Sequence, residues 1–138
     1  MSEQPRTPRP STNELFAQLR FTADGLVPAI AQQFDTGEVL MVAWMNTDAV
    51  RETLTTGRVC YWSRSRKSLW RKGESSGQVQ MLMEFRWDCD ADTILVQVDQ
   101  AGVACHTGRR NCFFNAVRDG EIQVIADVEI DPDKLYKK

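Results

Sequence analysis

The chain has 138 residues, of which 42% are hydrophobic and 26% are charged, so it is long enough to bury a core without disulfide support. The formal net charge of −2 excludes a protein that attracts nucleic acid by its overall charge, and no apolar run is long enough to span a membrane. Three of the five prolines fall in residues 1–12, which we predict to be a mobile tail before one catalytic domain over residues 13–138. Because this tail lacks the apolar segment of a secretory signal, we expect a cytoplasmic protein whose four cysteines are thiols or metal ligands.

The first half of the chain predicts two helices on either side of a hairpin. Cap residues followed by three apolar residues on one face predict a short helix in STNELFAQLRF. Two strand-like runs around DTGE predict a β-hairpin. Asn46 and Thr47 as possible N-caps, with Gly57 after the last helical residue, predict a second helix over about 47–56.

The second half of the chain is rich in strands. RVCYWS predicts a strand, whereas RSRKSLWRKGESSGQ is long, basic and punctuated by Gly and Ser, and therefore predicts a loop of the kind that carries function. VQMLMEFRW and TILVQVDQAG predict two strands, ACHTGRRNC a second loop, and FFNAVRDGEIQVIADV another hairpin. These elements predict a single compact α+β domain on a largely antiparallel β-sheet with about two short helices.

Asp88, Asp90 and Asp92 gather three carboxylates between the two predicted strands. Alternate side chains of a strand share one face, and a tight loop could also bring all three together. Such hard oxygen ligands suit Mg²⁺, which would relieve the repulsion between the carboxylates. The alternative is a solvated acidic turn, since aspartates are common in turns.

Three cysteines and one histidine form a second candidate site. Cys105 and Cys112 flank a polar, glycine-containing loop, and Cys89 lies inside the aspartate cluster. Thiolates favour zinc, and three protein ligands leave a fourth position open for water, which is the pattern of a catalytic zinc. The alternative is buried free cysteine, which suits Cys60 between its apolar neighbours better than the loop pair. His106 could be a fourth ligand or a proton shuttle.

The basic segment over residues 64–77 interleaves cations with tryptophan and small residues, and Arg109 and Arg110 add two cations in the cysteine loop. Cations and backbone donors suit phosphate groups, whereas cations beside aromatic rings also suit single-stranded nucleic acid. A solvated charged loop is the third possibility. Beside a candidate metal site, a small phosphorylated substrate is the interpretation that we favour.

Three motifs in this order closely resemble the phosphoribosyl-AMP cyclohydrolase family of histidine biosynthesis: WSRSRKSLWRKGESSG, DCDAD and CHTGRRNCFF. VLMVAWMN and the helix after it are also similar to that family, and the similarity runs from about Leu26 to about Gly120. Two positions depart from the family pattern. Ser75 stands where the family usually has threonine, and Asn111 stands where it usually has serine.

The resemblance implies that water adds at C6 of the adenine ring of N1-(5-phosphoribosyl)-AMP and that the N1–C6 bond breaks, giving the formimino-carboxamide ribonucleotide. It implies magnesium at the three aspartates of DCDAD. It also implies zinc held by Cys89 of one subunit of a two-fold homodimer and by Cys105 and Cys112 of the other. A general acid must protonate the departing nitrogen, and His106 is the nearest candidate by sequence.

The two phosphate groups of such a substrate need cationic side chains and backbone donors. The candidate substrate-binding residues are Arg64, Arg66, Lys67, Trp70, Lys72, Gly73, Glu74, Ser75, Ser76, Gly77, Arg109 and Arg110. This interpretation predicts a nucleotide substrate, no nucleic-acid partner and no membrane. Because the chain ends about 18 residues after Gly120, we expect no second catalytic domain.

Two other functions remain open from the residues. A zinc-stabilised nucleic-acid-binding module would bind in a salt-sensitive way without turnover. A metal-dependent phosphohydrolase would use the aspartates and release phosphate.

Overall fold

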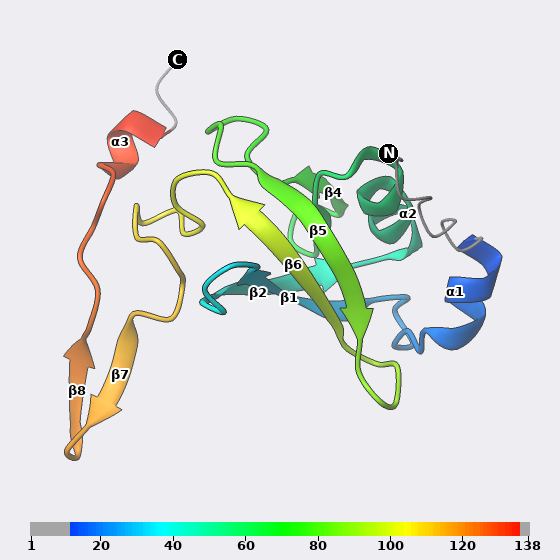
Figure 1. Cartoon of the computed structure of the whole chain (residues 1–138), viewed down its shortest axis with the longest axis horizontal. Coiled ribbons are helices and arrows are strands. Elements are labelled where there is room, and N and C mark those ends of the chain that lie inside the picture. Colours follow the sequence, from blue (N-terminus) through cyan, green and yellow to red (C-terminus); the bar gives the residue numbers. More distant parts are fainter. Residues whose placement is uncertain (1–11, 136–138) are drawn as a thin grey trace, which may run out of the picture.

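The protein, described here over residues 12–135 of a computed structural model, has an α+β architecture (Figure 1). A curled six-stranded sheet of order β4-β3-β2-β1-β6-β5 forms the body, and the two-stranded sheet β7-β8 extends from it as an arm. The strands are β1 (Val27–Gln33), β2 (Val39–Met45), β3 (Cys60–Ser63), β4 (Ser68–Arg71), β5 (Gln80–Trp87), β6 (Ile94–Gln100), β7 (Asn115–Arg118) and β8 (Glu121–Val124). The helices are α1 (Thr12–Gln18), α2 (Thr47–Thr56) and α3 (Pro132–Leu135). Of the predicted tail, residues 1–12, only Thr12 lies within the described part of the chain.

The helix α2 begins and ends where the sequence predicts. The side chain of Asn46 accepts a hydrogen bond from the Ala49 N–H at 2.8 Å, which caps the N-terminus. Gly57 adopts a left-handed conformation with φ 77°, and its N–H donates to the carbonyl of Thr53. The short helix α1 is confirmed as well. In the part of the chain that the structure describes, no helix is long and apolar enough to cross a membrane.

The sheet is mixed, which corrects the prediction of a largely antiparallel sheet. The predicted hairpins β1–β2 and β7–β8 are antiparallel, and so is the pairing of the two predicted strands β5 and β6. However, β1 and β6 run parallel, with Ile30 beside Leu95. These two strands are joined by a long connection that contains α2 and four other strands, and such a crossover permits parallel pairing. No local turn signal in the sequence could have revealed it.

The basic segment after β3 is not one continuous loop, contrary to the prediction. Its middle forms β4, which pairs with β3 in antiparallel fashion, so that Trp70 lies opposite Tyr61. Their ring centroids are 5.4 Å apart. This aromatic cross-strand pair stabilises a hairpin that the flanking glycines and serines obscured in the sequence.

The helix α3 was not predicted either. It begins at Pro132, a residue suited to the first turn of a helix.

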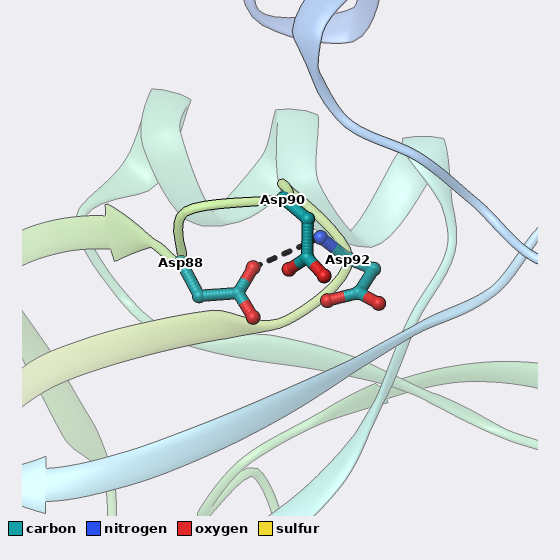
Figure 2. A group of neighbouring side chains, drawn as sticks. All are labelled: Asp88, Asp90 and Asp92. Carbon is teal, nitrogen blue, oxygen red and sulfur yellow. Dashed lines mark hydrogen bonds between the residues drawn. The ribbon is translucent and has the colours of Figure 1, made fainter.

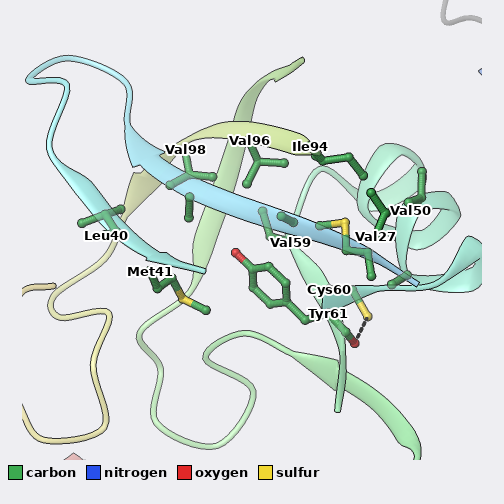
Figure 3. Close-up of a cluster of buried hydrophobic side chains, with 14 of the residues drawn as sticks. Val27, Leu40, Met41, Val50, Val59, Cys60, Tyr61, Ile94, Val96 and Val98 are labelled. Atoms are coloured by element: carbon green, nitrogen blue, oxygen red, sulfur yellow. Dashed lines mark hydrogen bonds between the residues drawn. The ribbon is translucent and has the colours of Figure 1, made fainter. Parts of the chain in front are cut away.

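The hydrophobic core lies between the sheet and the helices α1 and α2 (Figure 3). Alternate residues of both β1 and β6 are buried, so the parallel pair forms the centre of the core. Leu15 of α1 and Leu19, directly after this helix, join it, as their spacing predicts. Cys60 is fully buried here, which confirms the prediction that it is a core residue, and burial raises the pKa of its thiol to about 11.

Candidate active site

The turn between β5 and β6 brings the three aspartates together (Figure 2). One ligand oxygen from each of Asp88, Asp90 and Asp92 lies within 4.8 Å of the others, and all three residues are exposed. Asp88 Oδ1 accepts hydrogen bonds from the N–H groups of Asp92 at 3.0 Å and Thr93 at 3.2 Å, and Ala91 takes a positive φ of 63°. A tight turn, rather than one face of a strand, therefore makes the carboxylates converge.

These carboxylates shift one another's ionisation. Hydrogen bonds with Asp90 and Asp88 raise the pKa of Asp92. Desolvation opposes ionisation of Asp88, but hydrogen bonds from the backbone and side chain of Asp92 outweigh it and lower the pKa of Asp88. Close carboxylates repel one another, and a hard divalent cation relieves this repulsion, so this set of oxygen donors suits Mg²⁺.

The segment after β6, residues 101–112, is called the cysteine loop below, and it places two thiols side by side. The Cys112 thiol lies within hydrogen-bonding reach of the Cys105 sulfur, and Thr107 Oγ1 donates to Cys105 Sγ at 3.1 Å. Gly108 closes this turn by donating its N–H to the Cys105 carbonyl at 3.0 Å. A side chain at Gly108, where φ is 88°, would overlap the carbonyl of Ile130, so the turn requires glycine.

The two thiols differ in acidity. Burial opposes ionisation of Cys105, but hydrogen bonds from Thr107 and Cys112, together with the charge of Arg109, lower its pKa. Although Cys112 as a residue is exposed, desolvation of its thiol and then the neighbouring Cys105 raise its pKa to about 12. The two shifts run in opposite directions, so Cys105 ionises more readily than Cys112. Zinc displaces protons from cysteine ligands, so this soft donor pair suits it.

Cys89 lies apart from this pair. It is exposed in the aspartate turn before β6, whereas the cysteine loop follows β6, so the two lie at opposite ends of that strand (Figure 1). A seven-residue strand spans on the order of 20 Å. The loop does not double back, because the Cys112 N–H donates to the Leu40 carbonyl and Arg110 Nη1 donates to the Gln100 carbonyl. Over residues 12–135, no cluster of three candidate metal ligands includes the loop cysteines.

Lys72 connects the basic segment to the cysteine loop. Its Nζ donates to the Ala104 carbonyl at 2.7 Å, and the residue is only 8% exposed. The ammonium also lies 5.8 Å from the centre of the Trp70 ring. Burial lowers the pKa of Lys72, while the sulfurs of Cys112 and Cys105 act in the opposite direction. A cation in this position stabilises thiolates in the loop.

A cavity of about 270 Å³ lies beside Lys72, at the end of β4 and in the loop that follows. Gly73 has φ 82°, and a side chain there would overlap the backbone of Val79, so this tight passage requires glycine. Arg71 also lines the cavity and was not among the candidate residues; Glu52 holds its guanidinium through two hydrogen bonds, at 2.6 and 2.9 Å. The candidate substrate-binding residues that line the cavity are Arg66, Trp70, Lys72, Gly73, Glu74, Ser75 and Ser76.

The other candidates lie outside the lining of this cavity. Arg64 lies over the Trp44 ring at 4.7 Å, and Lys67 takes a positive φ of 53° in the turn between β3 and β4. Gly77 closes the loop after the cavity by donating its N–H to the Gly73 carbonyl at 2.8 Å. His106 is exposed in the cysteine loop. Their contacts with substrate, and the role of His106, stay predictions.

The two arginines of the cysteine loop are engaged within the protein. Arg109 lies over the Phe114 ring at 4.1 Å, and its Nε donates to the Ala126 carbonyl at 2.8 Å. Arg110 donates from Nη2 to Gln33 Oε1 at 2.9 Å, and other atoms of its guanidinium bind backbone carbonyls and a carboxylate. Both side chains therefore stabilise the loop, which is a role that the sequence analysis did not assign to them.

Known proteins are similar to this chain over most of its length. A family model described as Phosphoribosyl-AMP cyclohydrolase matches residues 41–114. The phosphoribosyl-AMP cyclohydrolase of Rhodospirillum centenum is 69% identical over 124 residues, which cover 90% of this chain and 93% of that protein. The chain belongs to the phosphoribosyl-AMP cyclohydrolase family. The member from Paramagnetospirillum magneticum is 65% identical over 90% of this chain, and that from Halorhodospira halophila is 57% identical over 99%.

Family membership confirms the resemblance that the three motifs predict. The matched residues contain the aspartate turn, the cavity and the cysteine loop, so all three candidate features lie within the family's shared segment.

Proposed function

We propose that the protein is a phosphoribosyl-AMP cyclohydrolase, a hydrolase of L-histidine biosynthesis that opens the adenine ring of N1-(5-phosphoribosyl)-AMP. The observation that carries this proposal is the 69% identity, across 90% of the chain, with a relative of that name. In the reaction one water adds at C6, the N1–C6 bond breaks and N1 gains a proton, so the formimino-carboxamide ribonucleotide contains the atoms of substrate and water.

The cavity beside Lys72 supports binding of a phosphorylated nucleotide. Arg66 and Lys72 bring cationic side chains to its wall, and Ser75 and Ser76 bring hydroxyl groups. These are the donors that phosphate and ribose oxygens need. Trp70 adds an aromatic surface on which a base can stack. The cavity would hold one end of the substrate and direct its purine ring toward the thiol pair next to Lys72.

The cysteines would hold zinc, and the aspartates would hold magnesium. When bound, zinc lowers the pKa of water and so supplies a nucleophile near neutral pH. Lys72 would stabilise the thiolate form of the ligands from its place beside the loop. His106, exposed and next to Cys105, would deliver the proton to the departing nitrogen.

A two-fold homodimer would complete the zinc site, with Cys89 from one subunit and the loop pair from the other. The position of Cys89 at the far end of β6 supports this, since one chain does not bring the three thiols together. The arm supports it too, because Val117 and Ile122, which face each other across β7 and β8, are 74% and 85% exposed. Such apolar residues are typical of a surface that a partner covers.

A cytoplasmic location is part of the proposal. All four cysteines are free thiols, and a reducing compartment keeps thiols in this state.

The test is incubation with N1-(5-phosphoribosyl)-AMP while the ultraviolet absorbance follows the opening of the adenine ring. We expect turnover that a zinc chelator stops, and a product heavier than the substrate by one water in a mass spectrum. Release of inorganic phosphate without ring opening would instead support a metal-dependent phosphohydrolase. Salt-sensitive binding of nucleic acid without turnover would support a zinc-stabilised binding module.

A further inference from the structure

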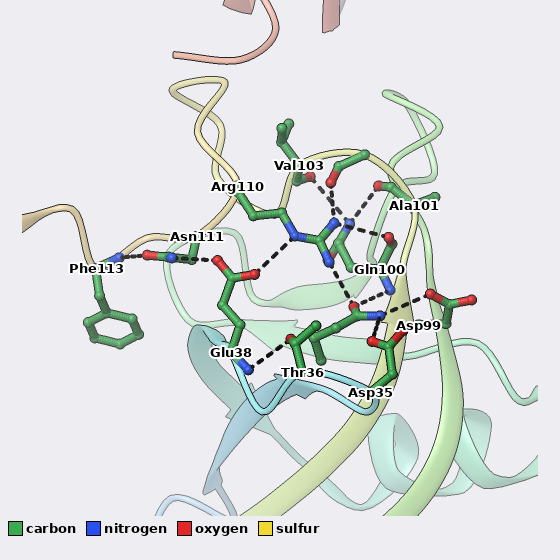
Figure 4. Close-up of polar contacts among 12 residues, drawn as sticks. Asp35, Thr36, Glu38, Asp99, Gln100, Ala101, Val103, Arg110, Asn111 and Phe113 are labelled. Atoms are coloured by element: carbon green, nitrogen blue, oxygen red, sulfur yellow. Dashed lines mark hydrogen bonds and ion pairs between the residues drawn. The ribbon is translucent and has the colours of Figure 1, made fainter. Parts of the chain in front are cut away.

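Glu38 belongs to none of the candidate sites above, yet its carboxylate contacts the two residues that precede Cys112 (Figure 4). Its Oε1 accepts a hydrogen bond from Arg110 Nε at 3.3 Å, and its Oε2 accepts one from Asn111 Nδ2 at 2.8 Å. One carboxylate directly before β2 therefore fixes two consecutive residues of the cysteine loop.

Asn111 extends this contact past the cysteine. Its Oδ1 accepts a hydrogen bond from the Phe113 N–H at 2.8 Å, so its side chain joins Glu38 to the backbone beyond Cys112. The N–H of Cys112 itself donates to the Leu40 carbonyl at 2.8 Å. Cys112 is thus held by two anchors that lie two residues apart in the chain, the carboxylate of Glu38 and the carbonyl of Leu40.

Arg110 extends the contact to the other cysteine. Its Nη1 donates to the carbonyls of Gln100 and Gly102, at 3.2 and 2.6 Å, which ties the beginning of the loop to its end. The carbonyl of Arg110 accepts from the Ala104 N–H at 2.9 Å, directly before Cys105. A movement of the Arg110 side chain would therefore change the position of Cys105 as well.

The backbone of Glu38 is itself held in place. Its N–H donates to Thr36 Oγ1 at 3.1 Å, and its carbonyl accepts from the Gln33 N–H at 2.8 Å, within the tight turn of the β1–β2 hairpin. The side chains of Arg110 and Glu38 are 25% and 32% exposed. An ion pair so accessible to water contributes little to global stability, so its main effect is on local geometry.

We propose that Glu38 is a positioning residue for the candidate zinc ligands. By holding Arg110 and Asn111, it sets the spacing between the Cys105 and Cys112 thiols before metal binds. This inference rests on the proposed function, because it requires that the thiol pair binds zinc. It also gives Asn111 a role that serine, whose side chain has two fewer heavy atoms, fills only in part. Serine can accept the hydrogen bond from Phe113 but does not reach Glu38 from the same backbone position.

The experiment compares zinc affinity, measured by competition with a chromogenic chelator, in the full-length wild-type protein and in Glu38→Ala and Glu38→Gln. The matched control is Asp48→Ala, which removes a different carboxylate that pairs with an arginine, also at 3.3 Å, but within helix α2. We expect Glu38→Ala to weaken zinc binding roughly 10- to 100-fold, as the loss of groups that orient metal ligands does. Glu38→Gln should lie between it and the wild type, since it keeps one of two acceptor oxygens. Asp48→Ala should match the wild type.

A second measurement separates positioning from stability. Cobalt(II) replaces zinc, and its thiolate-to-metal absorption reports how the sulfurs approach the metal. Glu38→Ala and Asn111→Ser should each change the intensity or position of this absorption per bound cobalt ion. Asn111→Ser provides an independent test of the proposal if Glu38→Ala does not fold. An unchanged zinc affinity and cobalt spectrum in the Glu38 variants, with or without a lower unfolding temperature, would overturn the positioning role and leave the proposed function intact. A wild-type protein that binds no zinc would overturn both.

Discussion

The two ends of β6 carry the two candidate metal sites, and they are built differently. At the beginning of β6, Asp88, Asp90 and Asp92 are close in sequence, and their ligand oxygens converge within one turn of one chain. At its end, Cys105 and Cys112 meet, but the third thiol lies in the aspartate turn. The comparison teaches that a ligand set close in sequence can assemble locally, whereas a set with a distant member does not assemble within one chain and, in our proposal, is completed by a second one.

The two ends also differ in what holds their backbones. The Asp88 carboxylate stabilises the aspartate turn by accepting hydrogen bonds from the N–H groups of Asp92 and Thr93, and these three residues lie within a six-residue segment. The cysteine loop depends on partners far away in the sequence, namely Glu38, Leu40 and Lys72. We therefore expect the aspartate turn to tolerate changes elsewhere in the protein, and the cysteine loop to respond to them.

The largest expected effect is the loss of a thiol ligand. Cys105→Ser and Cys112→Ser should each abolish turnover and zinc binding, because a hydroxyl is a poor zinc ligand at neutral pH. Cys60→Ser is the matched control: it changes a buried core thiol and should keep zinc and most of the activity. The zinc content and the kcat of each variant are measured against the wild type. Zinc loss in the Cys60 variant with retention in the Cys105 variant would reverse the assignment.

The next effect concerns proton transfer at the cysteine loop. His106→Ala should lower kcat by roughly 10²–10⁴ if His106 is the general acid. Zinc content should stay at the wild-type level, and one limb of the pH–rate profile should disappear. Metal loss in this variant would make His106 a fourth ligand, and unchanged kinetics with unchanged zinc would remove both roles.

Changes at the other end of β6 should separate the two metals. Asp88→Asn, Asp90→Asn and Asp92→Asn each remove one charge with little change in shape, so magnesium affinity should fall while zinc content is kept. The magnesium affinity is measured by titrating the activity with magnesium, and the zinc content is measured in parallel by metal analysis. A wild-type magnesium response in all three variants would leave the cluster as an acidic turn only.

The smallest effect is a change in thiol acidity. Thr107→Val removes the hydroxyl that donates to Cys105 Sγ at 3.1 Å and keeps the size of the side chain. Losing a donor to a thiolate raises its pKa, so alkylation of Cys105 in the metal-free protein should need a higher pH, by up to about one unit. A midpoint at the same pH as in the wild type, or lower, would contradict this source of the lowered Cys105 pKa.

The sequence predicts those parts of the fold that local signals encode. Asn46 and Gly57 define the ends of α2 through their own hydrogen bonds and backbone conformation. The glycine and aspartate turns likewise predict the hairpins. The parallel pairing of β1 with β6 and the strand β4 depend on packing between residues far apart in the chain, for which the sequence has no local pattern.

The same distinction applies to the site. Three motifs predict the aspartate turn and most of the cavity wall, because the residues of each are close in sequence. Glu38 was missed, since a single glutamate in a hairpin turn resembles any solvated charge until its contacts with Arg110 and Asn111 are seen. The contacts that engage Arg109 and Arg110 were missed for the same reason.

The measurement that tests the shared zinc site most directly is a mixing experiment. Homodimers of Cys89→Ala and of Cys105→Ala should both be inactive. A mixed dimer of the two would have both lesions in one site and leave the other site whole, since an isologous interface creates two identical sites. Refolding the two variants together should therefore restore activity, up to about half of the wild-type value per mixed dimer. No recovery, with mixed dimers shown to form, would contradict the account, because ligands from a single chain would leave a lesion in every site.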